Sequence, residues 1–144
     1  MMIKKLASIL IINYNNAAYL DRAIRSCLNQ SYKNIEILVF DDKSIDGSKY
    51  ILEKYKKNNK IRYFLNKSKK LQIPAFDARN AYNYLIDKCS GEILFMLDSD
   101  DFFLKDKISK IFKKFNSNSK INFIQDMPFI ILKNNNKKIY KKNS

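Results

Sequence analysis

Short apolar runs alternate along this chain with stretches in which apolar residues recur at helical spacing. The apolar runs predict β-strands at Ser8–Ile12, Ile35–Phe40, Ile61–Leu65 and Ile93–Leu97. The first run is almost continuously apolar, which is typical of strands that are covered on both faces. The pattern therefore predicts a buried sheet.

Amphipathic stretches follow each of these strands. Between residues 18 and 28, apolar side chains recur at i, i+4, i+7 and i+8, as on one face of a helix. Two further apolar stripes predict helices, one formed by Ile51, Leu52 and Tyr55 and the other by Ile108, Ile111, Phe112 and Phe115. Another helix is predicted to begin at Pro74 and to run to about Lys88. Strands and helices thus alternate along the chain.

This alternation predicts an α/β fold in which a mostly parallel sheet carries helices on both faces. The C-terminal part predicts a fifth strand at Ile121–Gln125 and a hairpin of Phe129–Leu132 with Lys138–Tyr140. In open parallel sheets the ligand crevice lies beyond the carboxyl ends of the strands. The residues that follow each strand are therefore the candidates for chemistry.

Polar and acidic residues follow three of the predicted strands. Asn13-Tyr14-Asn15 follows the first strand, Asp41-Asp42 the second, and Asp98-Ser99-Asp100-Asp101 the fourth. Because the carboxyl ends of parallel strands share one edge, a ring, amides and carboxylates are expected to converge on one crevice. The sequence therefore predicts a ligand site at this edge of the sheet.

Asp98 and Asp100 form an Asp-x-Asp pattern. Alternate residues of a strand point the same way, so both carboxylates can face one cavity, where they would repel each other. A divalent cation relieves this repulsion, and Mg²⁺ or Mn²⁺ prefers oxygen ligands, often one or two carboxylates with substrate phosphates. The alternative is that Asp100 or Asp101 caps the following helix.

Three other side chains suit a nucleotide, and each has a structural alternative. Tyr14 can stack on a base, or it is an ordinary half-buried aromatic residue. Asp42 can accept hydrogen bonds from a base or a ribose, or it bonds to its own turn. Arg79, on the proline-started helix, can reach a phosphate with its planar guanidinium group, or it is a solvated helix charge.

Composition narrows the chemistry. The 144-residue chain has no histidine, which excludes histidine-dependent triads, histidine zinc sites and an imidazole base. Its two cysteines, Cys27 and Cys89, make neither a four-cysteine zinc site nor a disulfide framework, so a reducing compartment is expected. The length suits one compact domain.

The chain is strongly basic, with 28 Lys+Arg against 14 Asp+Glu and a net charge of +14. This balance fits a compositional bias toward Lys, Asn and Ile, an anionic membrane surface, or a nucleic-acid partner. No nucleic acid is expected, because the lysines are scattered without interleaved aromatic residues. The expected location is cytoplasmic, with a peripheral position at the inner membrane face as one interpretation of the charge.

These segments together resemble the nucleotide-sugar-binding half of a family 2 glycosyltransferase with the GT-A fold. The resemblance rests on their order and spacing over residues 6–104, and the segments are Ser8–Asn15, Leu28–Tyr32, Glu36–Ser48, Ala78–Asn80 and Gly91–Asp101. It implies transfer of a sugar from a nucleoside diphosphate, usually UDP-linked, to an acceptor hydroxyl with inversion. It also implies Mn²⁺ or Mg²⁺ as cofactor and a glycan or lipid-linked acceptor in cell-surface glycan synthesis.

The resemblance implies nucleotide-binding roles for residues at the strand ends. Asn13 and Tyr14 fall in the nucleotide-binding segment, and Tyr14 resembles the residue that stacks on the base. Asp42 resembles the acid that contacts the base edge. Arg79 lies near the position of a basic residue beside the nucleotide.

The Asp-x-Asp motif matches the family residue by residue. Asp98 and Ser99 resemble its ribose-proximal part, and Asp100 resembles the direct ligand of Mn²⁺ or Mg²⁺, with Asp98 beside it. The catalytic base of the acceptor reaction has no clear counterpart, since only Asp106 and Asp126 are acidic beyond the motif. The catalytic residue is therefore left unassigned.

Family members usually continue beyond this length into an acceptor half. The expectation is one incomplete GT-A domain at residues 1–132 and a Lys/Asn-rich tail at residues 133–144. Two alternatives to an active glycosyltransferase stay open. One is an inactive nucleotide-sugar-binding remnant or half of a split enzyme. The other is a basic nucleic-acid-binding module, whose binding would depend steeply on salt and not on divalent metal.

Overall fold

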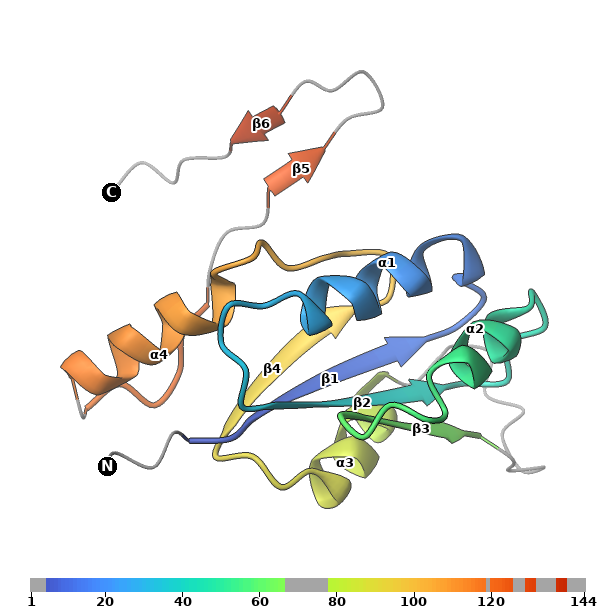
Figure 1. The fold of residues 1–144 in the computed structure, drawn as a ribbon, viewed down its shortest axis with the longest axis horizontal. Helices are drawn as coiled ribbons and strands as arrows, with labels where there is room; N and C mark the ends of the chain where they lie inside the picture. Colours follow the sequence, from blue (N-terminus) through green and yellow to red (C-terminus); the bar gives the residue numbers. More distant parts are fainter. Residues whose placement is uncertain (1–4, 67–77, 119, 126–128, 132–136, 140–144) are drawn as a thin grey trace. The chain divides into compact units, whose positions relative to one another are not determined.

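The four predicted strands form one parallel sheet in the computed structural model of the chain, in the order β3-β2-β1-β4 (Figure 1). Their bounds are Ala7–Asn13 for β1, Ile35–Asp41 for β2, Ile61–Leu65 for β3 and Ile93–Asp98 for β4. The structure describes residues 5–66, 78–118, 120–125, 129–131 and 137–139. The predicted α/β fold is confirmed, and β1, β2 and β4 each include the polar residue that follows the predicted strand.

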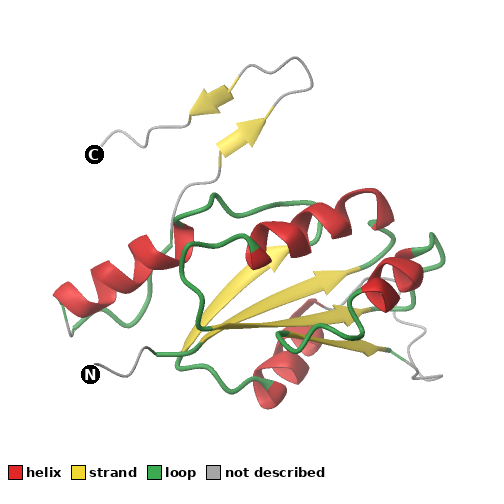
Figure 2. Cartoon of the chain, in the orientation of Figure 1, coloured by secondary structure: helices red, strands yellow, loops and turns green. Residues whose placement is uncertain are grey.

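Helices cover both faces of this sheet, as predicted (Figure 2). They are α1 at Ala17–Leu28, α2 at Ser48–Lys54 and α3 at Ala78–Lys88, and a further helix, α4, spans Lys107–Ser117. α1 and α2 lie over one face and α3 over the other (Figure 1). The predicted helix start at Pro74, and the polar loop before it, lie outside the described residues. No helix in the described ranges is long and apolar enough to cross a membrane.

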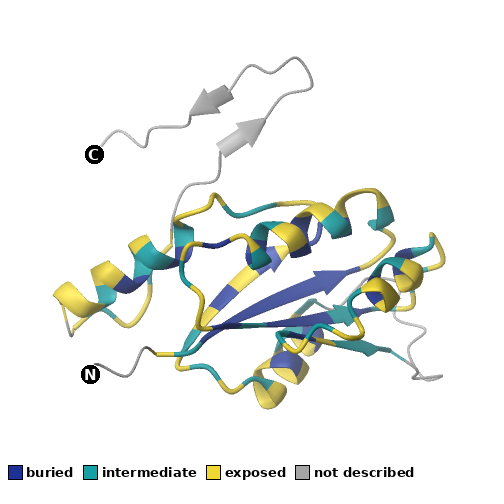
Figure 3. Cartoon of the chain, in the orientation of Figure 1, coloured by how far each residue is buried: buried dark blue, intermediate teal, exposed yellow. Residues whose placement is uncertain are grey.

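The core has one apolar layer on each face of β1 and β2. Leu10 and Leu38 are buried in a cluster with Leu85 of α3. Ile9 and Ile37 alternate with these leucines, so they face the α1 side, and both are fully buried. Figure 3 shows β1 buried along its whole length. Burial on both faces explains why residues 9–12 of β1 are continuously apolar rather than alternating.

A hydrogen-bond network joins the sheet at the amino ends of its strands. Glu36 of β2 accepts hydrogen bonds from the Ser8 hydroxyl at 2.6 Å, from the Ser90 amide and from the Arg62 guanidinium group at 2.8 Å. The Ser8 hydroxyl in turn accepts one from Gly91 N at 2.8 Å. Burial by itself would raise the pKa of Glu36, but these hydrogen bonds and the charge of Arg62 outweigh it and lower that pKa.

Acid is therefore expected to weaken the fold through Glu36. A carboxyl whose pKa is lower in the folded than in the unfolded chain stabilises the fold above its unfolded pKa, and this contribution is lost as the pH falls through the folded value. We expect the free energy of unfolding of the parent to fall more between about pH 6 and pH 3 than that of Glu36→Gln, as measured by urea unfolding. The control Glu53→Gln removes an exposed acid paired with Lys49 at 3.9 Å and should follow the parent. Equal pH dependence of Glu36→Gln and the parent would contradict this assignment.

The chain divides into two compact units, Met1–Lys110 and Ile111–Ser144. In the second unit, β5 at Phe129–Ile131 pairs antiparallel with β6 at Lys137–Ile139. This pairing confirms the predicted hairpin. The connection between its strands, and the part of the predicted tail beyond β6, lie outside the described residues.

The predicted strand at Ile121–Gln125 is wrong. Asn118 makes a turn just before it: its carbonyl accepts a hydrogen bond from Ile121 N at 3.2 Å, and its side-chain oxygen accepts one from Lys120 N at 3.0 Å. Residues 121–125 pair with no strand among the described residues. Alternation of apolar residues does not make a strand where no neighbouring strand completes the hydrogen bonds of the backbone.

Candidate functional site

The polar residues at the strand ends meet in register at one edge of the sheet. Asn13 of β1 lies beside Asp41 of β2, and Ile12 of β1 lies beside Asp98 of β4. Because β1 lies between β2 and β4, the carboxyl ends of all three strands are adjacent. The predicted convergence of these strand ends is confirmed.

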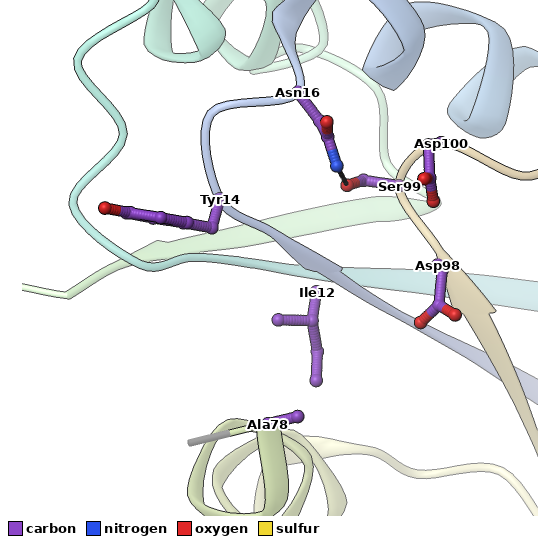
Figure 4. A pocket seen from close by; sticks show the side chains of 7 residues that line it. All are labelled: Ile12, Tyr14, Asn16, Ala78, Asp98, Ser99 and Asp100. Atoms are coloured by element: carbon purple, nitrogen blue, oxygen red, sulfur yellow. Dashed lines mark hydrogen bonds between the residues drawn. The ribbon is translucent and has the colours of Figure 1, made fainter. Parts of the chain in front are cut away.

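An open pocket of about 240 Å³ lies at this edge of the sheet (Figure 4). Within the described part of the chain it is lined by Ile12, Tyr14, Asn16, Ala78, Asp98, Ser99 and Asp100. These residues come from the ends of β1 and β4, the loops that follow them, and the first residue of α3. The pocket therefore brings together Tyr14 with Asp98, Ser99 and Asp100, all of which the sequence predicted.

The loop after β1 presents Tyr14 at the pocket. Asn15 has a left-handed backbone with φ of 50°, which asparagine adopts more readily than most residues, and its side-chain oxygen accepts a hydrogen bond from Ile45 N at 2.9 Å. Asp46 accepts a hydrogen bond from Ala17 N at 2.7 Å, at the start of α1. These bonds tie the loops after β1 and β2 together. Tyr14, a residue with 51% exposure, is accessible to a ligand.

Asn13 does not line the pocket. Its side chain is fully buried, and its amide nitrogen donates to Asp41 Oδ1 at 2.6 Å and to Ser44 Oγ at 3.1 Å. The Asn13 Oδ1 atom is buried and accepts no hydrogen bond from the residues that the structure describes. In this structure Asn13 holds the ends of β1 and β2 together.

Asp42 and Arg79 also lie outside the pocket lining. Asp42 is half-buried after β2, where its carboxylate accepts a hydrogen bond from the Asn66 side chain and its amide donates to Asn13 O at 2.9 Å. Arg79 is exposed in the first turn of α3, next to Ala78, which does line the pocket. The roles of Asp42 and Arg79 toward a nucleotide stay predictions.

Negative charge is concentrated at the end of β4. Burial raises the pKa of Asp101, the charges of Asp100 and Asp98 raise it further, and Arg22 lowers it. The Tyr82 hydroxyl of α3 donates a hydrogen bond to Asp98 Oδ1 at 3.4 Å. Burial, followed by the charge of Asp98, raises the pKa of Tyr82, so this hydroxyl keeps its proton. The end of β4 therefore attracts cations.

The residues at the end of β4 fit a hard divalent cation. Asp98 and Asp100 both line the pocket, and carboxylate oxygens are the ligands that Mg²⁺ and Mn²⁺ prefer. Among the described residues, no three acidic, cysteine or histidine side chains gather to hold a metal. One or two carboxylates together with substrate phosphates are a usual Mg²⁺ site. The donor set therefore suits a cation that arrives with a phosphate ligand.

Sequence reasoning missed two polar contacts of this site. Asn16 Nδ2 donates to Ser99 Oγ at 3.0 Å and joins the loops after β1 and β4 (Figure 4). Asn16 would have been found if the search for site residues after each strand had been extended a few residues along the loop. Tyr82 carries no such signal, because its contact with Asp98 depends on how α3 packs.

The sequence as a whole matches a known family. Residues 8–143 match the sequence model described as Glycosyl transferase family 2. The chain belongs to glycosyltransferase family 2. This match confirms the resemblance drawn from the strand-end motifs.

A curated relative of this family 2 chain is the GalNAc(5)-diNAcBac-PP-undecaprenol beta-1,3-glucosyltransferase of Campylobacter jejuni. The two are 36% identical over 110 residues. The alignment covers 76% of this chain and 34% of the relative. The family 2 chain thus spans about a third of the length of this relative.

Solved structures of glycosyltransferases share the fold. TarS of S. aureus, residues 1–349 in complex with UDP-GlcNAc, matches with a TM-score of 0.64 and 21% identity. The match covers 77% of this chain and 31% of that TarS chain. The mannosyltransferase PcManGT of Pyrobaculum calidifontis, in complex with GDP-Man and Mn²⁺, matches with a TM-score of 0.68 and 17% identity over 79% of this chain and 33% of PcManGT. The family 2 chain therefore has a GT-A-type fold.

Proposed function

We propose that this chain binds the donor of a metal-dependent glycosyltransferase, which transfers a sugar from a UDP-sugar to an acceptor hydroxyl with inversion. The observation that carries the proposal is the pocket at the ends of β1 and β4, where an aromatic ring and two carboxylates meet. A ring suits a base, and paired carboxylates suit a cation bound to a diphosphate. The complexes of TarS with UDP-GlcNAc and of PcManGT with GDP-Man and Mn²⁺ support a nucleotide-sugar donor.

The nucleotide would lie along the ends of β1 and β2. Tyr14 stacks on the base with its exposed ring, and Asp42 accepts a hydrogen bond from the base edge. Ser99 and Asp98 contact the ribose at the end of β4. Arg79, exposed at the start of α3, offers a planar cation to the phosphates.

Asp100, with Asp98, would hold Mn²⁺ or Mg²⁺. When bound, the cation supplies positive charge that stabilises the negative charge growing on the diphosphate leaving group. The chain itself restrains the groups around it. The Tyr82 hydroxyl donates to the Asp98 carboxylate, and Asn16 donates to the Ser99 hydroxyl. These bonds limit how far the pocket side chains can rotate.

The acceptor side of the reaction needs a base that removes a proton from the attacking hydroxyl. We assign no residue of this chain to that role, since Asp106 is exposed in the segment before α4 and Asp126 lies outside the described residues. The acceptor class that we propose is a glycan or a lipid-linked saccharide. The name of the Campylobacter relative, which contains PP-undecaprenol, supports a lipid-linked saccharide.

Calorimetric titration of the chain with UDP, in the presence and absence of Mn²⁺, tests this proposal. Saturable binding that requires the cation is expected, and parallel titrations with GDP measure the base preference. No binding of any nucleoside diphosphate would overturn the donor site. Binding that ignores the cation and falls steeply with salt would favour the nucleic-acid alternative. A hydrolysis assay that measures the release of UDP from a UDP-sugar would distinguish an active chain, which releases UDP, from an inactive remnant, which does not.

Asp42→Ala is expected to weaken UDP binding and to leave Mn²⁺ binding unchanged. A hydrogen bond to a charged acceptor contributes enough that its loss should cost about tenfold or more in affinity for UDP. Asp87→Ala removes an exposed acid of the same type near the end of α3 and is the matched control. Equal affinity of Asp42→Ala and Asp87→Ala for UDP would remove Asp42 from the site.

A further inference from the structure

The acidic turn, residues 98–101 at the end of β4, is followed by a segment that is hydrogen-bonded along one side of α1. Arg22 and Ser26 lie one helical turn apart on α1, and Gln30 continues the i, i+4, i+8 spacing just beyond its end. The Ser26 hydroxyl accepts a hydrogen bond from Phe103 N at 3.0 Å, and Gln30 Nε2 donates to Leu104 O at 2.8 Å. Gln30 is fully buried. The course of this segment is therefore set by α1.

Arg22 makes the first contact in this series, and it contacts the acidic turn itself. Its Nη2 donates a hydrogen bond to Asp100 O at 2.6 Å. Its guanidinium carbon lies 5.3 Å from the ring centre of Tyr19 and 5.1 Å from that of Phe102. Contact with two aromatic rings restricts the plane of the guanidinium group, so the hydrogen bond has a defined direction.

The acidic turn needs such a restraint because three carboxylates follow one another closely. Asp101 N donates to Asp98 O at 3.0 Å and closes the turn, but the charges of Asp98 and Asp100 both act on Asp101. Mutual repulsion favours conformations that separate the three groups. A cation placed on the backbone carbonyl of Asp100 opposes this repulsion without occupying the carboxylates.

We propose that Arg22 is a positioning residue, which holds the backbone of Asp100 so that the Asp100 side chain faces the pocket. The Asp100 carbonyl and side chain branch from the same residue, so a restraint on the carbonyl also limits where the carboxylate can point. Arg22 itself is not among the residues that line the pocket. The effect of Arg22 on cation and nucleotide binding rests on the proposed function, whereas its restraint of the Asp100 backbone does not.

Four chains test this role: the parent, Arg22→Gln, Arg22→Lys and Arg25→Gln. Arg25 is the matched control, because it is an exposed arginine on the same helix that pairs with Asp21 at 2.7 Å instead of with the turn. Arg22→Lys keeps the charge and removes the planar group that contacts the two rings. Amide hydrogen exchange at Asp101, followed by NMR without any ligand, reports on the turn. Calorimetry with UDP and Mn²⁺ reports on the site.

We expect both Arg22 variants to lose protection at the Asp101 amide, with Arg25→Gln unchanged. Affinity for UDP in the presence of Mn²⁺ should fall about 10- to 100-fold in both Arg22 variants, the range found when groups that orient metal ligands are removed. UDP binding measured without the cation should not change.

Three results would overturn the proposal in distinguishable ways. Unchanged exchange at Asp101 in Arg22→Gln would show that Arg22 does not hold the turn. Full affinity for UDP with Mn²⁺ in Arg22→Gln, despite faster exchange at Asp101, would show that the restraint on the turn does not position the Asp100 side chain. A parent that binds no nucleoside diphosphate with any divalent cation would overturn the proposed function and the ligand-directed role together, even where exchange at Asp101 changes as expected.

Discussion

Asp100→Ala is expected to abolish the cation-dependent part of UDP binding while the fold stays intact. Asp100 is exposed, lines the pocket and lies two residues beyond the end of β4. Its removal takes away the proposed direct ligand of the cation and leaves Asp98 as the one carboxylate among the described lining residues. Alanine keeps the backbone carbonyl that accepts the Arg22 hydrogen bond, so the turn itself should persist.

The measurement is UDP affinity with and without Mn²⁺, together with urea unfolding. Asp100→Ala should bind UDP with and without Mn²⁺ as weakly as the parent does without the cation. Its midpoint of unfolding should stay close to that of the parent. Asp87→Ala, which lacks a different exposed acid, should behave as the parent in both measurements. If Asp100→Ala still bound UDP more tightly with Mn²⁺ than without it, the assignment of Asp100 as a metal ligand would be contradicted.

Gly91→Ala is expected to destabilise the fold severely, although residue 91 is remote from the pocket lining. A Cβ atom at residue 91 would lie 2.7 Å from Ser8 N and 2.8 Å from Leu6 O, and closer still to the Ser8 hydroxyl. Both backbone atoms belong to the start of β1 or the residue before it and cannot move without disturbing its pairing with β4. We expect a loss of about 3 kcal/mol or more in the free energy of unfolding, since overpacking against backbone is relieved poorly.

Gly47→Ala provides the comparison, because residue 47 requires glycine for its backbone conformation, whereas residue 91 requires it for lack of space. Gly47 has a left-handed backbone with φ of 93°, and among the described residues a Cβ there would meet Tyr50 alone, at 3.9 Å. Its substitution should therefore cost about 1 kcal/mol from backbone strain alone. Urea unfolding of both variants at neutral pH gives the two losses. A smaller loss for Gly91→Ala than for Gly47→Ala would contradict the close approach of residue 91 to β1.

Several features of this molecule could be predicted from the sequence because they are local. The apolar runs predict β1 to β4, and the run is most continuous in β1, which is buried on both faces. The acidic and aromatic residues after these runs predict where a site lies, because parallel strands end at one edge of the sheet. The same reasoning failed at Ile121–Gln125, where an apolar pattern has no neighbouring strand among the described residues.

The sequence by itself thus determined the fold class, the family and the edge of the sheet at which the candidate site lies. Only the tertiary structure decided which of the strand-end residues line the pocket. Asn13 has the polar side chain expected of a ligand contact, but its pairing with Asp41 turns it into the interior. Arg22 of α1 and Tyr82 of α3 contact the acidic turn from 78 and 16 residues earlier in the chain, and from opposite faces of the sheet. Such contacts depend on how helices pack on the sheet, and residue patterns within one element carry no information about distances between elements.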